Sequence, residues 1–185
     1  MITGENIVLR ALELDDIDLL YQWENDRTSW HLSNTLTPFS RFALEQYIMT
    51  ADQDIFAVKQ LRLMIDKTET DGRKCIGAID LFDFDPVNKR AGIGILINKN
   101  ERNKGFASEA LKLLIQYCFN TLELHQLYCN IETTNTGSIK LFQNQDFEIV
   151  GNKKDWIRKN SQWTDEYFLQ LINQKVERTE EKGKE

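Results

Sequence analysis

The stretch that decides the fold reads Ile93-Gly94-Ile95-Leu96-Ile97-Asn98-Lys99-Asn100-Glu101-Arg102-Asn103-Lys104-Gly105-Phe106-Ala107. Its apolar first half predicts a buried strand, and its second half is a short basic loop that leads directly into a helix. The first turn of a helix leaves backbone N–H groups without partners at the positive end of the helix dipole. The sequence therefore predicts an anion-binding site where the loop meets the helix.

Four residues at the end of this segment suit a phosphate group. Gly105 lets a phosphate approach the backbone, and Ala107 keeps the next position small. Arg102 and Lys104 add positive charge that could meet phosphate oxygens. The pattern lacks the three glycines of a Rossmann fingerprint and the Gly-Lys-Ser/Thr of a Walker loop. A purely structural basic loop is the alternative interpretation.

Periodicity on both sides of this segment predicts a mixture of strands and helices. Strands are expected at residues 6–12, 55–59, 61–67, 74–84, 90–97, 127–133, 147–150, 154–159 and 163–172. Helices are expected at 13–25, from an N-cap at Ser40, at 105–119 and at 135–144. These elements predict a single α+β domain at 1–174, followed by a charged, disordered tail at 175–185.

Composition narrows the class of protein. The formal net charge of −6 argues against a nucleic-acid partner, because such proteins present a basic face. No apolar stretch is long enough to cross a membrane, and no targeting segment opens the chain, so we expect a cytoplasmic protein. An acidic surface favours a cationic substrate, although it is also typical of proteins that are merely soluble.

The cysteines and histidines do not follow a metal-binding pattern. Cys75, Cys118 and Cys129 are odd in number and sit among apolar neighbours, so we expect reduced core residues. His31 and His125 have no partner at metal-ligand spacing. The sequence therefore predicts no metal site.

Two motifs resemble those of the GNAT N-acetyltransferases. Arg102, Gly105 and Ala107 match the Arg/Gln-x-x-Gly-x-Gly/Ala signature of that family. The helix that carries Asn135, Ser138, Ile139, Leu141 and Phe142, ending in Asp146-Phe147, is similar to the family's Asn-x-x-Ser-Ile-x-Leu-Phe and Gly-Phe segment. Residues 7–12 and 160–167 resemble the branch with ribosomal-protein N-terminal acetyltransferases and spermidine acetyltransferases. The likeness covers roughly residues 6–174 in the family's order.

The resemblance implies a fold and a cofactor site. The fold would be a central mixed, mostly antiparallel sheet with helices on both faces, in which the parallel strands 90–97 and 127–133 splay apart. The pantetheine arm of acetyl-CoA, the co-substrate, would lie in that gap. The cofactor-binding residues would then be Ile95, Leu96, Ile97, Arg102, Asn103, Lys104, Gly105, Phe106, Ala107, Asn135, Ser138 and Phe142.

The resemblance also implies direct transfer of the acetyl group to a primary amine in a ternary complex. Many relatives place a tyrosine four residues before the Gly-Phe pair, where this chain has Phe142, so Ser138 becomes the candidate acid for the leaving thiolate. A helix hydroxyl bonded to its own backbone is the alternative for Ser138. Glu132 is the candidate base that would accept the proton of the amine, and the alternative is a solvated carboxylate at the end of a strand.

Asp146 stands where the family usually has glycine, and aspartate tolerates the left-handed backbone that such a turn needs.

The acceptor is less well defined than the donor. A polyamine is favoured, a protein N-terminus is close behind, and an aminoglycoside stays open. The residues that could hold a cationic acceptor are Glu24, Asp26, Asp80, Asp83, Asp85, Trp23, Trp30, Trp156 and Trp163, although solvated charges and core aromatics are the commoner case. The sequence is also compatible with assembly of this protein into a homo-oligomer. A non-catalytic acyl-CoA-binding module and a nucleotide-binding domain are the competing classes.

Overall fold

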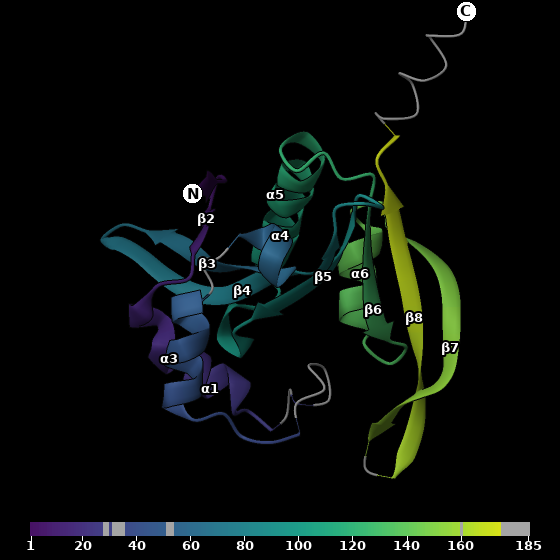
Figure 1. Cartoon of the computed structure of the whole chain (residues 1–185), viewed down its shortest axis with the longest axis horizontal. Coiled ribbons are helices and arrows are strands. Elements are labelled where there is room, and N and C mark those ends of the chain that lie inside the picture. Colours follow the sequence, from purple (N-terminus) through teal and green to yellow (C-terminus); the bar gives the residue numbers. More distant parts are fainter. Residues whose placement is uncertain (28–29, 31–35, 51–53, 160, 175–185) are drawn as a thin grey trace, which may run out of the picture.

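The protein is described here by a computed structural model that covers residues 1–27, 30, 36–50, 54–159 and 161–174. Three features expected from the sequence lie outside the described residues: the tail at 175–185, His31, and Asn160 in the turn before the last strand. One sheet of eight strands runs through the described chain in the order β1-β2-β3-β4-β5-β6-β8-β7 (Figure 1).

The strands of this sheet are β1 (Ile2–Thr3), β2 (Ile7–Ala11), β3 (Leu61–Glu69), β4 (Gly72–Asp85), β5 (Arg90–Ile97), β6 (Gln126–Glu132), β7 (Glu148–Lys159) and β8 (Gln162–Ile172). The helices are α1 (Ile17–Glu24), α3 (Arg41–Thr50), α4 (Ile55–Val58), α5 (Phe106–Asn120) and α6 (Thr136–Gln143), with 3-10 turns at Leu14–Asp16 and Lys99–Glu101. All neighbouring strands pair antiparallel except β5 and β6, which are parallel. The predicted α+β fold class is confirmed.

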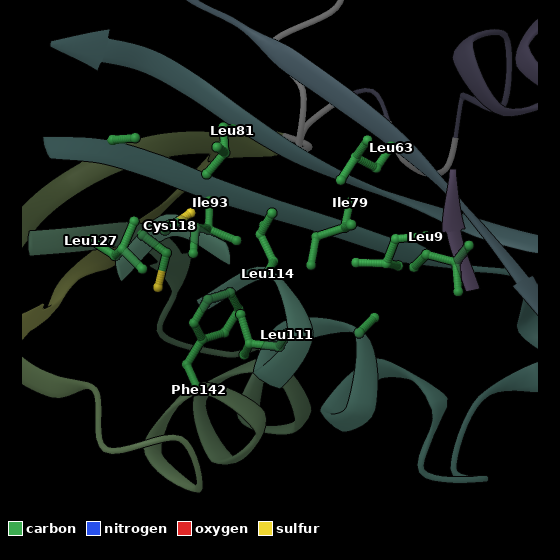
Figure 2. Close-up of a cluster of buried hydrophobic side chains, with 14 of the residues drawn as sticks. Leu9, Leu63, Ile79, Leu81, Ile93, Leu111, Leu114, Cys118, Leu127 and Phe142 are labelled. Atoms are coloured by element: carbon green, nitrogen blue, oxygen red, sulfur yellow. The ribbon is translucent and has the colours of Figure 1, made fainter. Parts of the chain in front are cut away.

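Helices α5 and α6 pack on one face of the sheet and bury the main core. Leu111, Leu114 and Cys118 of α5 are fully buried, as their spacing on one helical stripe predicts. Figure 2 shows them pointing toward side chains of the sheet, with Phe142 of α6 beside them. Removing each such side chain from water contributes about 1.5–3 kcal/mol. The core therefore fixes α5, and with it the loop that precedes α5, against the strands.

Helices α1 and α3 pack against each other around a second, smaller cluster. Leu20 of α1 meets Leu44 and Ile48 of α3, all of them buried. The Oγ of Ser40 accepts a hydrogen bond from the N–H of Ala43 at 3.1 Å, so the predicted N-cap is confirmed. In Figure 1 these two helices lie together beside the β2 to β4 part of the sheet.

The strand predicted at residues 55–59 is wrong. The residues form the short helix α4, because the carboxylate of Asp54 accepts the N–H of Phe56 at 3.0 Å and starts a helical turn. Lys59 then adopts a left-handed backbone with φ of 55° and ends the turn. The apolar composition of the segment suits a buried strand equally well, and only the capping aspartate distinguishes the two.

The two strands predicted at 147–150 and 154–159 are one strand, β7. It stays paired with β8 through two register shifts, between Ile149 and Gly151 and between Lys153 and Ile157. Asp146, just before β7, has φ of 63°, so the expected left-handed backbone is confirmed.

The cysteines are free thiols, as expected. Cys118 and Cys129 are buried, and Cys75 is half-buried. Burial raises the pKa of the Cys118 thiol to about 12. The two buried cysteines therefore behave as small core residues.

Candidate active site

The parallel pair β5 and β6 opens into a gap. The two strands pair at three positions only, Arg90 with Gln126, Ala91 with Leu127 and Gly92 with Tyr128. Beyond these positions β5 continues beside β4, and β6 continues beside β8. In Figure 1, β6, β8 and β7 lie together on one side of the molecule, and β2 to β5 extend to the other. The predicted splayed pair is therefore present, and it opens toward the loop at 98–105.

Alternation along β5 decides which peptide groups face this gap. The N–H of Asn98, just after β5, donates to the carbonyl of Ile76 in β4 at 2.8 Å. Because successive residues of a strand point their peptide groups to opposite sides, Leu96 also faces β4, whereas Ile95 and Ile97 face the gap. Of the three predicted contacts with the pantetheine arm, the backbone of Leu96 is thus already engaged in the sheet. Ile93 shares the direction of Ile95 and was missed from sequence, because strand pairing has no local signal.

Two basic side chains of the loop, Arg102 and Lys104, each make a hydrogen bond within the protein. The Nε of Arg102 turns back and donates to the carbonyl of Ile97 at 2.9 Å, which closes the end of β5. The ammonium of Lys104 lies 2.9 Å from Glu101, and this hydrogen bond lowers the pKa of the Glu101 carboxyl. Arg102 and Lys104 therefore help to shape the loop, and their contact with phosphate stays a prediction, as does an anion site at the backbone amides that follow.

Those amides are presented by an unusual backbone at the start of α5. Asn103 and Gly105 have φ of 60° and 88°, and the helix begins at Phe106. Gly105 has no side chain to cap the helix, and the first N–H bonded to its carbonyl is that of Glu109. The N–H groups of Phe106, Ala107 and Ser108 are the first-turn donors that have no acceptor in an α-helix. N–H groups of this kind can bind a phosphate group, and the site predicted here from the sequence stays a prediction.

Ser138 and Asn135 meet at the N-terminus of α6. The Oδ1 of Asn135 accepts the N–H of Ser138 at 3.2 Å, so Asn135 is the N-cap of this helix. Ser138 is half-buried, and among the residues that the structure describes its hydroxyl forms no hydrogen bond. The alternative of a hydroxyl bonded to its own backbone is therefore not what the structure shows. Ser138 as an acid stays a prediction.

Phe142 lies in the core. Its side chain is buried, and its ring stands edge-on to Phe147 at a centroid distance of 5.0 Å. The residue that replaces the family's tyrosine thus anchors α6 to the strand that follows. Its contact with the cofactor stays a prediction.

Glu132 is the last residue of β6, on the side of the sheet that α5 does not cover. It is 6% exposed, and its Oε1 accepts the hydroxyl of Thr134 at 2.8 Å. The alternative of a solvated carboxylate at a strand end does not fit this burial. Glu132 therefore keeps a position from which it could accept a proton near the gap.

A row of three aromatic rings lines the same face beside the splay. The ring of Tyr128 lies 5.8 Å from Phe82 and 5.4 Å from Phe168, centroid to centroid. Gly92 leaves room for Phe82, since a Cβ at Gly92 would lie 2.3 Å from that ring. Tyr128 donates to Asp83 at 3.2 Å, and burial with this carboxylate raises the pKa of Tyr128 to about 12. Tyr128 therefore stays protonated and acts as a donor.

The carboxylates proposed from sequence for a cationic pocket are engaged internally. Arg62 donates to both oxygens of Asp80, at 2.7 and 3.0 Å, and to Glu24 at 2.7 Å. Asp85 holds a turn through the N–H groups of Val87 and Asn88, at 3.1 and 2.9 Å. Asp83 remains exposed beside Tyr128.

The remaining predicted acceptor residues fall into two groups. The carboxylate of Asp26 lies 3.9 Å from the ammonium of Lys99. The indole N–H groups of Trp23 and Trp30 donate to Asn98 and to the carbonyl of Glu24, at 3.0 and 2.8 Å. Trp156 and Trp163 are exposed on the β7 and β8 hairpin. The second pair of tryptophans is therefore the more exposed one, and the ring of Trp156 already contacts the ammonium of Lys153.

Two other features are absent from residues 1–27, 30, 36–50, 54–159 and 161–174. Within them, no three or more histidine, cysteine, aspartate or glutamate side chains form a group that could hold a metal ion. Nor does any helix in these ranges have the length and apolar character needed to cross a membrane.

The gap between parallel strands, leading to the open amides of α5, defines the class of acyl-CoA-dependent transferases. Residues 6–148 match the family of the acetyltransferase (GNAT) domain. The uncharacterized N-acetyltransferase p20 of Bacillus licheniformis is 33% identical over 91% of this chain and 93% of its own. The chain therefore belongs to the GNAT acetyltransferase family, is an N-acetyltransferase and has acetyl-CoA as its co-substrate, as the sequence predicts.

Two further comparisons concern relatives with named acceptors. The spermidine N(1)-acetyltransferase of Escherichia coli K12 is 25% identical, over 82% of this chain and 77% of its own. The crystal structure of spermidine N-acetyltransferase from Vibrio cholerae, in complex with CoA and spermine, aligns with a TM-score of 0.81 at 21% identity, covering 91% of this chain and 96% of that one. At this identity the second comparison confirms the fold.

Proposed function

We propose that the protein transfers the acetyl group of acetyl-CoA to a primary amine by direct attack within a ternary complex. The observation that carries this proposal is the gap after Gly92 and Tyr128, which leads to the unpaired N–H groups at the start of α5. A pantetheine arm in the gap would pair with the peptide groups of Ile95 and Ile97, and the pyrophosphate would meet the α5 amides. The thioester would then lie beside Glu132 and Ser138.

The reaction needs two proton transfers. The neutral amine attacks the thioester carbonyl carbon, the new C–N bond forms, and the C–S bond breaks to release the thiolate of CoA. Glu132 would take the proton that the amine loses, directly or through water. The Ser138 hydroxyl would protonate the thiolate, and the proton held by Glu132 would return to the Ser138 oxygen through water, so that both side chains regain their starting forms. The products are an N-acetylamine and CoA.

The proposed acceptors are polyamines and protein N-termini. The relatives named spermidine N(1)-acetyltransferase support the first class. The pairing of Glu24 and Asp80 with Arg62 supports the second, because it leaves less free negative charge for a polycation. A homo-oligomer is also proposed, since one structural neighbour is described as dodecameric.

A panel of amines tests the function. Incubation with acetyl-CoA and a thiol reagent is expected to release CoA with spermidine, with spermine or with short peptides that have a free N-terminus. If the protein binds acetyl-CoA but releases no CoA with any amine of the panel, it is a non-catalytic acyl-CoA-binding module. Stabilisation against heat by ATP rather than by CoA would indicate a nucleotide-binding domain instead.

Replacing Ser138 with alanine is expected to lower kcat about 10- to 50-fold, because the thiolate loses its acid and water replaces it only in part. Binding of acetyl-CoA should change less than about threefold, since the N–H of Ser138 still donates to Asn135. Stopped-flow turnover and titration calorimetry measure the two effects. Thr136→Ala, on the same helix turn, is the matched control and should retain kcat. An unchanged kcat in Ser138→Ala would remove Ser138 from the mechanism.

A further inference from the structure

The ammonium group of Lys153 lies in a cage of acceptor and aromatic groups. Its Nζ donates to the Oδ1 of Asn130 at 2.6 Å and to the Oε2 of Glu166 at 2.8 Å. The same nitrogen lies 5.1 Å from the ring centre of Trp156 and 5.8 Å from that of Phe168. A carboxylate, an amide oxygen and two ring faces are the groups that bind an organic ammonium ion. We call these four residues around Lys153 the ammonium cage.

The ammonium cage lies beside the splay. Asn130 belongs to β6 beyond Tyr128, the last residue of β6 that pairs with β5. Glu166 stands directly opposite Glu132 in the pairing of β6 with β8. The ring of Phe168 also contacts Tyr128, so the cage continues the aromatic row. An amine that reaches the thioester from this face therefore passes close to Lys153.

We propose that Lys153 selects the acceptor by filling, with its own ammonium, the place where a second ammonium of a diamine or polyamine would bind. The inference rests on the proposed amine acetylation and narrows its substrate class. A second cation near Lys153 meets like-charge repulsion instead of a carboxylate. Two of the three N–H donors of Lys153 are used by Asn130 and Glu166, and the third, which bonds to no other described residue, can meet a carbonyl or carboxylate of the acceptor. The favoured acceptor carries one ammonium and a nearby carbonyl, as a peptide N-terminus does.

Lys153→Met tests this role because methionine keeps an unbranched apolar stem and removes the charge. The probes are n-butylamine and 1,4-diaminobutane, which share a chain length and differ in the second ammonium. The ratio of kcat/KM for the diamine to that for the monoamine is expected to rise about 10-fold, the effect of one partly buried ammonium contact. Lys153→Arg keeps the positive charge and should leave the ratio near that of the native enzyme.

Lys154→Met is the matched control. It removes the same charge from the next residue of β7, whose side chain is exposed, so its ratio should stay unchanged. An equal rise in Lys153→Met and Lys154→Met would show an effect of net charge and overturn the proposal. No rise in Lys153→Met would overturn it as well. Lys153→Gln, which can still hydrogen-bond to both cage oxygens, gives the same test should the methionine variant fold poorly.

Calorimetric titration separates this proposal from the proposed function. With CoA present, 1,4-diaminobutane is expected to bind Lys153→Met about 10-fold more tightly than it binds the native enzyme. Equal affinities would overturn the role of Lys153, whether or not acetylation occurs. Conversely, tighter binding to Lys153→Met without acetylation of any amine would support the ammonium cage and overturn the proposed function.

Discussion

Replacing Gly105 with alanine is expected to weaken acetyl-CoA binding about 100-fold or more, measured by titration calorimetry. Gly105 has φ of 88°, where alanine costs roughly 1–2 kcal/mol, so the α5 amides would leave their present alignment. A Cβ at this position would meet no protein atom within 4 Å, and it would stand in the space proposed for the phosphate. Losing two charge-assisted hydrogen bonds, at about 1.5–3 kcal/mol each, accounts for the expected loss.

Gly72→Ala is the matched control for this prediction. Gly72, the first residue of β4 after the turn from β3, has φ of 136°, and a Cβ there also meets no atom within 4 Å. Both variants should lose a similar amount of stability, because both place alanine at a positive φ. Only Gly105→Ala should lose acetyl-CoA binding. Normal binding by Gly105→Ala would show that the amides of this loop are not the anion site.

The segments that the sequence predicts best are those where local pattern and burial agree. The bounds predicted for β5 are those observed, since its apolar run is enclosed by turns on both sides. Helix α5 follows its stripe of Ala110, Leu111 and Leu114, all of which are fully buried. The loop between β5 and α5 was located for the same reason. The sequence therefore predicts the strand, the loop and the helix correctly, and the anion site between them stays a prediction.

The parts that the sequence missed depend on pairing between distant strands. The direction of the Ile93 peptide groups follows from the pairing of β5 with β4. The ammonium cage needs β6, β8 and β7 in one register, with a shift after Lys153. The hydrogen bond from Arg102 to the carbonyl of Ile97 is likewise a feature of the folded loop alone. No short motif encodes such contacts, because a one-residue change of register reverses the face of every side chain.

Gly77→Ala is expected to lower the free energy of unfolding by about 3 kcal/mol, measured by denaturant titration. Gly77 lies in β4 opposite Ile97, and a Cβ there would stand 2.2 Å from the carbonyl oxygen of Leu96 and 3.2 Å from the Cα of Ile97. Both are backbone atoms, so no side-chain rotation relieves the contact, and overpacking of this kind typically costs about 1–3 kcal/mol. The two strands would have to move apart at the end of β5.

Gly94→Ala is the control for this steric effect, because it also adds a methyl group to a glycine of the sheet. Gly94 lies in the adjacent strand β5, where the nearest atom to an added Cβ is the ring of Phe82 at 4.0 Å, an ordinary contact. The free energy of unfolding of Gly94→Ala should therefore stay within about 0.5 kcal/mol of the native value.

Gly77→Ala should also bind acetyl-CoA more weakly, because the end of β5 supports the loop through the bond from Arg102 to Ile97. If the two variants were equally stable, β4 and β5 could separate at Gly77 at little cost in free energy. The close pairing at Gly77 would then not be what fixes the position of β5 beside the gap.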